Sequence, residues 1–295
     1  MPRSISGRFR SGSVGLVAAV CLVACSSEPD SPAASTATAP SGAAEEGTYL
    51  ALGDSVPFGF RGSALAEFPD PANFVGYPEL VGDELGLDVV NASCPGETTG
   101  SFLDAAAQSN GCGSSLQAGF GYRNAYPLHV EYEAPDQSQL DFAADLLSAD
   151  DDVELVTVQI GANDAFLCQR TTASRCSSPA DVLALAQRVE ANLATILSAL
   201  RERYDGQLVV VTYYALDYAD AFGTATRQLV AGIARVAQEH GADVADAFAA
   251  FEGRANAAGG DSTEAGLVLP NDVHPTVEGQ RLLADAVLAV VEDQS

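Results

Sequence analysis

Residues 48–55 read Thr-Tyr-Leu-Ala-Leu-Gly-Asp-Ser, a short apolar run followed directly by a polar turn. An apolar run of this length, ended by glycine, predicts a buried strand rather than a helix. We expect the strand to cover Thr48–Leu52. The serine of the Gly-Asp-Ser tripeptide should then lie at the carboxyl end of that strand.

Similar runs recur along the chain and alternate with helical patterns. The further strands are expected at Leu87–Val90, Leu155–Ile160, Leu208–Thr212 and, more weakly, Asp243–Ala245. Strands that alternate with helices predict a parallel sheet with helices on both faces. The sequence therefore favours an open, doubly wound α/β sheet, in which ligands bind beyond the carboxyl ends of the strands.

Three helices are predicted, two from start signals and one from its helical spacing of apolar residues. One begins after the N-cap Ser178, with Pro179 in its first turn, and stops before Gly206. Asp136 with Gln139 is expected to open a second helix that ends near Leu147. The third should run from Pro275 to about Val291, with its apolar residues on one stripe.

Polar blocks follow the first three strands, and another precedes the last helix. They are Gly53-Asp54-Ser55, Asn91-Ala92-Ser93-Cys94-Pro95-Gly96, Gly161-Ala162-Asn163-Asp164 and Asn271-Asp272-Val273-His274-Pro275. Each block alone is weak evidence, because such residues also form ordinary turns and helix caps. Parallel strands bring their carboxyl ends to one edge, so the blocks should converge there.

In this order, the four blocks resemble those of the SGNH hydrolase superfamily, the GDSL-like lipases and esterases. The resemblance spans residues 49–291 and implies a three-layer, flavodoxin-like α/β fold with serine ester hydrolase activity. It implies Ser55 as nucleophile, His274 as its base, and an oxyanion hole made by the backbone N–H groups of Ser55 and Gly96 with the side-chain amide of Asn163. Asp54 and Asp164 are expected to support the turns.

These residue types suit ester hydrolysis for physical reasons. A serine hydroxyl is a poor nucleophile unless a neutral imidazole takes its proton, and fixed donors stabilise the charge that develops on the carbonyl oxygen. The other two histidines have structural interpretations, since His240 precedes a glycine at a helix end and His129 lies in an irregular segment. The mechanism requires neither a metal nor a cofactor.

One position departs from the family pattern. The family has aspartate three residues before the catalytic histidine, whereas this chain has Asn271 there and Asp272 one step later. Either residue is a possible orienting group for His274. We expect a backbone carbonyl to orient the imidazole instead, so that loss of the Asp272 side chain costs less than about 30-fold in rate.

The substrate is expected to be an extracellular lipid or another small acyl ester. A carbohydrate O-deacetylase and a non-catalytic surface binding lipoprotein on the same scaffold are the alternatives. Four aromatic residues after the nucleophile are candidates for an acyl pocket or for core: Phe58, Phe60, Phe74 and Tyr77.

The N-terminal segment predicts export. Arg3, Arg8 and Arg10 precede the apolar run Val14–Ala24, which is shorter than the ~20 residues of a membrane span. The sequence Leu-Val-Ala-Cys, which ends at Cys25, resembles the bacterial lipobox. The alternative is an ordinary signal peptide that is followed by a cysteine without a role in lipidation. Lipidation of Cys25 would be the only membrane contact, with the protein on the outer face of the cell membrane, or secreted.

The domain boundaries follow from composition. We predict a lipoprotein-type signal peptide at residues 1–24, a disordered tether rich in Ser, Ala, Thr, Pro and Glu at 25–47, and the hydrolase domain at 48–295. The segment from Asn110 to Pro135 lacks a clear period and is either a lid or a surface insertion. The formal net charge of −26 argues against nucleic acid as a partner, and the oligomeric state is left open.

Export would expose the remaining cysteines to an oxidising compartment. Four thiols allow three pairings, and we favour Cys94 with Cys112 and Cys168 with Cys176, because each pair closes one loop between regular segments. Zinc binding is the alternative, but neither pair has the close spacing of structural zinc sites.

Overall fold

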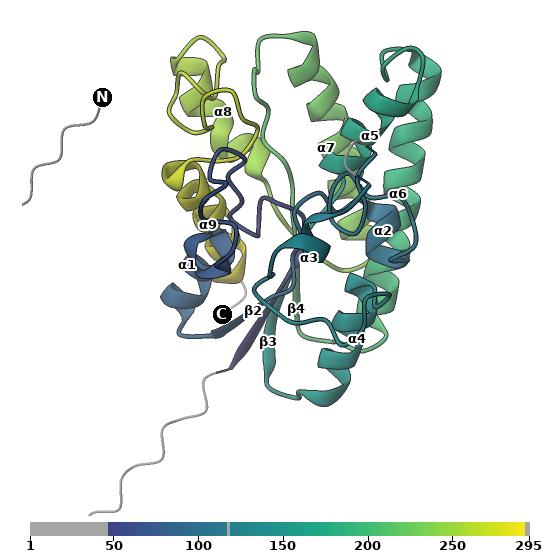
Figure 1. Ribbon diagram of the computed structural model, residues 1–295. Coiled ribbons are helices and arrows are strands. Elements are labelled where there is room, and N and C mark those ends of the chain that lie inside the picture. The colour runs from purple at the N-terminus through teal and green to yellow at the C-terminus, as the bar shows by residue number, and fades with distance from the viewer. Residues whose placement is uncertain (1–46, 117–118, 293–295) are drawn as a thin grey trace, which may run out of the picture. The chain divides into compact units, whose positions relative to one another are not determined.

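The computed structural model describes residues 47–116 and 119–292, and in this part of the chain five strands form one sheet (Figure 1). The strands are β1 (Thr48–Gly53), β2 (Asp88–Asn91), β3 (Val153–Gln159), β4 (Gln207–Val211) and β5 (Asp243–Ala245). All neighbouring strands are parallel, in the order β2-β1-β3-β4-β5. This order is the flavodoxin-like one, and it confirms the predicted doubly wound α/β class.

Helices cover both faces of the sheet. One layer contains α1 (Tyr77–Leu85), α8 (Ala247–Ala257) and α9 (Val277–Glu292). The other contains α2 (Thr99–Leu103), α4 (Gln139–Ala149), α5 (Ala162–Thr171), α6 (Pro179–Arg201) and α7 (Ala221–Glu239) (Figure 1). The short helix α3 (Tyr122–Ala125) and a 3₁₀ turn (Pro71–Asn73) lie in connecting segments. Within the described residues, no helix combines the length and the apolar character needed to cross a membrane.

The central strands are apolar because both of their faces are covered. Every residue of β1 from Tyr49 onward is buried, and β3 and β4 carry a similar run of buried aliphatic side chains. These strands show little alternation between polar and apolar residues, which is typical of a parallel sheet covered on both sides.

The helix start signals were correct in one case and misplaced in another. Ser178 caps α6 as expected, with its hydroxyl accepting a hydrogen bond from the Asp181 N–H at 3.1 Å. Helix α4, in contrast, is capped by Ser138 and not by Asp136. The Ser138 hydroxyl accepts from the Asp141 N–H at 3.0 Å, and the Asp141 carboxylate accepts from the Ser138 N–H at 3.1 Å, so the reciprocal pair begins two residues later than predicted.

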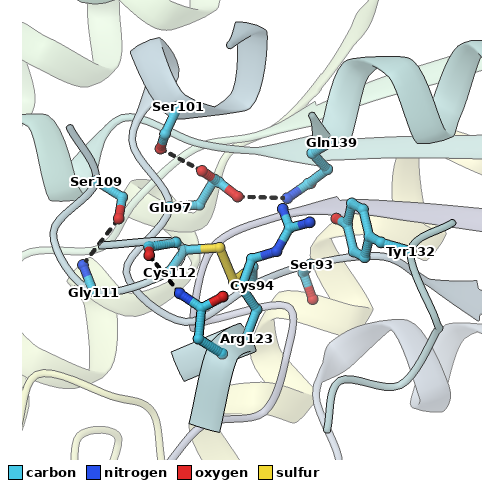
Figure 2. The surroundings of a disulfide bond; sticks show 12 residues. Ser93, Cys94, Glu97, Ser101, Ser109, Gly111, Cys112, Arg123, Tyr132 and Gln139 are labelled. Atoms are coloured by element: carbon cyan, nitrogen blue, oxygen red, sulfur yellow. Dashed lines mark hydrogen bonds between the residues drawn. A yellow bond between two sulfur atoms is a disulfide. The ribbon is translucent and has the colours of Figure 1, made fainter. Parts of the chain in front are cut away.

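The described part of the chain contains two disulfide bonds, Cys94–Cys112 and Cys168–Cys176, and they are the favoured pairs. Figure 2 shows the first of them beside Glu97. Cys94, Glu97 and Cys112 lie close enough together to suggest a metal site among the described residues, but both sulfur atoms are used in the disulfide. The lipidation residue Cys25 lies outside the described part of the chain.

Candidate active site

The Gly53-Asp54-Ser55 turn lies at the end of β1 and requires a glycine. Gly53 has a φ of +144°, and a Cβ there would lie 2.2 Å from the backbone oxygen of Gln159. The following turn is closed by the Asp54 carboxylate, which accepts a hydrogen bond from the Val56 N–H at 3.0 Å. The strand and this turn together place the half-buried Ser55 at the carboxyl edge of the sheet.

Ser55 and His274 meet although they are far apart in the sequence. The His274 Nε2 atom lies 2.9 Å from the Ser55 Oγ atom. The histidine loop is tied to the end of β4, because the Tyr214 hydroxyl donates to the Val273 carbonyl at 2.6 Å. A neutral imidazole at this distance can accept the serine proton.

The group that orients the imidazole is a carboxylate, and the expectation of a backbone carbonyl was wrong. Asp272 Oδ1 lies 2.5 Å from the His274 Nδ1 atom, and Asn271 is exposed. Asn271 has a φ of +57°, a left-handed conformation that asparagine adopts more readily than most residues. The carboxylate that the family has three residues before the histidine is therefore present here two residues before it.

The environment keeps Asp272 ionised. Partial burial raises the pKa of this carboxyl, but the hydrogen bond and charge of His274, together with hydrogen bonds from the Val273 and Gly62 N–H groups, outweigh burial and lower the pKa to about 2. Its second oxygen, Oδ2, accepts from the Gly62 N–H at 3.0 Å. The negative charge is thus available to stabilise a protonated imidazole.

Gly96 and Asn163 line one cavity with Ser55 and His274. Gly96 has a φ of +87°, and a Cβ at this position would lie 2.7 Å from the Gly111 backbone. Asn163 is in the first turn of α5, where its side-chain amide is buried. The predicted oxyanion donors therefore line the same cavity as Ser55.

Asp54 forms contacts that the sequence did not reveal. Its Oδ2 atom accepts from the Tyr213 hydroxyl at 2.6 Å and from the Asn163 side-chain amide at 3.2 Å. Burial raises the pKa of this carboxyl to about 6, and its hydrogen bonds act in the opposite direction. Tyr213 directly follows the fourth predicted strand, Leu208–Thr212, but no polar block pointed to its role.

The remaining predicted supports and structural histidines lie where expected. Asp164 accepts from the Thr99 N–H at 2.8 Å and from the Thr99 hydroxyl at 2.7 Å, which joins α5 to α2. His129 contacts the Phe58 carbonyl at 3.1 Å, and His240 caps the end of α7. Neither histidine contacts Ser55 in the structure.

Only one of the four aromatic candidates reaches the active site. Phe58 and Phe74 are fully buried in an aromatic cluster, and Tyr77 belongs to the main core. Phe60 packs edge-on against the His274 ring, with 5.0 Å between ring centroids, and lines the cavity. Three of the four residues are therefore core, which is one of the two interpretations that the sequence left open.

Two hollows meet at Ser55, Asn163 and His274. The smaller, of about 350 Å³, contains the Gly96 side of the site. The larger is an apolar groove of about 950 Å³ that runs between the amino-terminal halves of α6 and α7. Its larger apolar side chains are Phe166, Leu183, Leu185, Leu216, Phe222 and Leu229.

Comparison with known proteins assigns the family. The profile of the GDSL-like lipase/acylhydrolase family matches residues 51–282. The chain belongs to this family. It is accordingly a hydrolase that acts on ester bonds.

Solved structures share the fold of this GDSL-like hydrolase at low sequence identity. An acetylxylan esterase from Geobacillus stearothermophilus is 18% identical, with a TM-score of 0.52 over 82% of this chain and 93% of the other. A phospholipase A1 from Streptomyces albidoflavus is 20% identical, with a TM-score of 0.50 over 85% and 100%. An extracellular lipase from Streptomyces rimosus is 21% identical, with a TM-score of 0.51 over 82% and 99%. A search of curated protein sequences finds no match.

Proposed function

We propose that the hydrolase cleaves acyl esters with Ser55, His274 and Asp272 as a catalytic triad. The Ser55 oxygen attacks the ester carbonyl carbon while its proton passes to Nε2 of His274. The imidazolium then gives this proton to the leaving alcohol as the bond between carbonyl carbon and alcohol oxygen breaks. Water, activated by the same imidazole, releases the acid from the acyl-enzyme. The contacts at 2.9 Å and 2.5 Å along the triad support this assignment.

The charge on the carbonyl oxygen is stabilised by three donors: the N–H groups of Ser55 and Gly96 and the amide of Asn163. They need no reorganisation during the reaction, since Gly96 packs against Gly111 and Asn163 is hydrogen bonded on both sides of its amide. Fixed donors of this kind lower the barrier more than mobile water does.

The preferred substrate is an acyl ester of an uncharged or zwitterionic lipid. The apolar groove that opens onto Ser55 carries this proposal, because each buried methylene of an acyl chain contributes about 0.8 kcal/mol. Three of its apolar side chains are exposed to solvent: Leu183 at 58%, Leu216 at 44% and Phe222 at 70%. Exposure of apolar surface to water is unfavourable, and a bound acyl chain would cover it. The net charge of −26 disfavours anionic lipids. The smaller hollow takes the alcohol part.

The protein acts outside the cytoplasm, anchored by a lipid at Cys25 or released. The lipobox-like residues 22–25 and the two disulfide bonds support this proposal, since disulfides persist in oxidising compartments.

A serine-directed phosphonate tests the nucleophile. It should add to Ser55 and abolish ester hydrolysis, and Ser55→Ala should be inactive while its circular dichroism spectrum is unchanged. Addition to a different serine, or full activity of Ser55→Ala, would refute the triad.

A panel of esters tests the substrate. Nitrophenyl esters of increasing chain length should show kcat/KM rising by about three- to fourfold per methylene until the groove is filled. Phe222→Ser should reduce this slope and leave acetate hydrolysis unchanged, whereas Leu65→Ser, an exposed leucine outside both hollows, should change neither. A preference for acetylated sugars over every long-chain ester would instead identify a carbohydrate O-deacetylase.

A further inference from the structure

The residues around the Cys94–Cys112 disulfide form a strap against the active site. The strap is Ser109–Cys112, at the start of the irregular segment (Figure 2). The buried Ser109 hydroxyl donates to the Ser114 carbonyl at 2.6 Å and accepts from the Ser114 N–H at 3.0 Å. The disulfide ties the other end to a residue two positions before Gly96. The strap is therefore held at both ends beside a candidate oxyanion donor.

Asn110, in this strap, contacts both of the non-serine oxyanion donors. Its backbone N–H donates to the Gly96 carbonyl at 2.8 Å. Its side-chain Nδ2 donates to Asn163 Oδ1 at 2.7 Å, and its Oδ1 accepts from the guanidinium of Arg170 at 2.6 Å. One residue outside the four sequence blocks thus links two of them.

The ends of this hydrogen-bond chain decide its direction. The Arg170 guanidinium only donates, so the oxygen of Asn110 must face it and the nitrogen must face Asn163. Asn163 then presents its oxygen to Asn110 and its nitrogen to Asp54, at 3.2 Å from Oδ2. Above about pH 6 the Asp54 carboxyl is ionised and only accepts. A cation at one end and an anion at the other give both amides the same orientation.

This orientation has a consequence for the reaction. The Asn163 nitrogen has two N–H groups, and Asp54 takes one of them, which leaves the second for the oxygen of the ester carbonyl. Rotation of the Asn163 amide by a half turn would instead present an oxygen to that charge. A chain of aligned hydrogen bonds also polarises its members, so the remaining N–H becomes a better donor.

We propose that Asn110 is a positioning residue of this hydrolase, whose side chain sets the orientation of the Asn163 amide and whose backbone holds Gly96. The proposal rests on the proposed function, because it requires Asn163 to act as an oxyanion donor. Asn110 itself does not touch the reacting atoms. Arg170 acts one step further away, by orienting Asn110.

Asn110→Asp is the most direct test. Aspartate has nearly the same shape and still accepts from Arg170, but it cannot donate to Asn163, so the Asn163 amide should rotate. We expect kcat to fall by ~10²-fold, the usual effect of losing one oxyanion donor, with KM within about threefold of wild type and an unchanged melting temperature. Asn124→Asp is the matched control, because it breaks a hydrogen bond to Gly113 in the same segment away from the site.

A double-mutant cycle separates positioning from a structural role. If Asn110 acts through Asn163, Asn110→Asp should cost little further activity in an Asn163→Ala background. Arg170→Met should lower kcat less than Asn110→Asp does. Arg170→Lys should have a higher kcat than Arg170→Met, because lysine can still donate a hydrogen bond to Asn110.

Three results would overturn the positioning role: unchanged kcat in Asn110→Asp, a loss that falls on KM, or full additivity with Asn163→Ala. If Ser55→Ala is inactive and Asn163→Ala is strongly impaired while Asn110→Asp keeps full activity, only this inference fails. If Asn163→Ala and Ser55→Ala are both active, the proposed function itself fails.

Discussion

Replacing Glu97 by glutamine should stabilise the protein at alkaline pH. Glu97 follows Gly96 and is only 2% exposed, beside the Cys94–Cys112 disulfide (Figure 2). Its carboxylate accepts a hydrogen bond from the Ser101 hydroxyl and a longer one, at 3.4 Å, from the Gln139 amide. Glutamine has the same length and can bond both partners without carrying a charge.

The magnitude follows from the pKa of Glu97. Burial raises it from an ordinary 4.5 to about 7, against the opposing effects of Ser101, Arg123 and Gln139. At about 1.4 kcal/mol for each pH unit, keeping this group ionised costs the folded state about 3 kcal/mol. Since the folded pKa is raised, the group's contribution to stability is complete below about pH 4.5 and is lost as pH rises through about 7.

Urea unfolding followed by circular dichroism, without reductant, measures the effect. The free energy of unfolding of Glu97→Gln should match that of wild type near pH 4 and exceed it by up to about 3 kcal/mol near pH 8. Asp54 also titrates in this range in both proteins, and its negative charge is one of the effects that raise the pKa of Glu97, so the measured difference includes this coupling. Glu84→Gln, at an exposed position of α1, should show no such pH-dependent gain. A variant less stable than wild type by a constant amount at every pH would show that the bonds of the charged carboxylate outweigh its burial.

Three further predictions follow from the structure and the sequence. Asp272→Ala should lower kcat by ~10²- to 10⁴-fold in a folded protein, because the imidazolium loses its counter-charge. The kcat of Asn271→Ala should stay within about threefold of wild type. Near-normal turnover in Asp272→Ala would instead support orientation of His274 by a backbone carbonyl. Removing the Cys94–Cys112 disulfide with Cys94→Ala and Cys112→Ala should reduce the free energy of unfolding by about 3 kcal/mol and lower kcat, because the strap becomes more mobile. A loss of stability with normal kcat would show that the disulfide does not contribute to catalysis. Cys25→Ser should move the protein from the membrane fraction to the medium or leave it unprocessed, and mass spectrometry finding an unmodified Cys25 in mature protein would exclude the anchor.

The fold was predictable because its signals are local. Buried parallel strands are short apolar runs, and each of the five expected runs overlaps an observed strand, with boundaries shifted by at most two residues. The capping error at α4 has an equally local cause. Two acceptable caps stand close together, and Ser138 has Asp141 at the spacing that allows a reciprocal pair.

The site was only partly predictable from the sequence. Short motifs indicate which residues lie in the turns after strands, but they do not indicate which distant segments contact one another. Ser55, Gly96, Asn163 and His274 each follow a strand or precede a helix, and the resemblance of these blocks to the SGNH hydrolase pattern drew attention to them. The expectation of a backbone carbonyl in place of Asp272 failed for a different reason, because residue spacing was used in place of geometry. Asn271 has a left-handed backbone conformation, and the aspartate that follows it reaches His274 Nδ1 from two residues before the histidine instead of three. A rule based on residue spacing contains no information about the φ angle of Asn271.

The contacts that orient these groups left no signal in the sequence. Neither Tyr213 nor Asn110 belongs to one of the four polar blocks. Tyr213 bonds Asp54 across 159 positions of the chain, and Asn110 bonds Asn163 across 53. A buried amide has no preferred orientation of its own, so its partners must supply one. In this hydrolase, the direction of the Asn163 amide is set by Arg170 at the surface and Asp54 in the interior. Two charges outside the reacting groups therefore decide whether the amide offers a donor or an acceptor to the substrate.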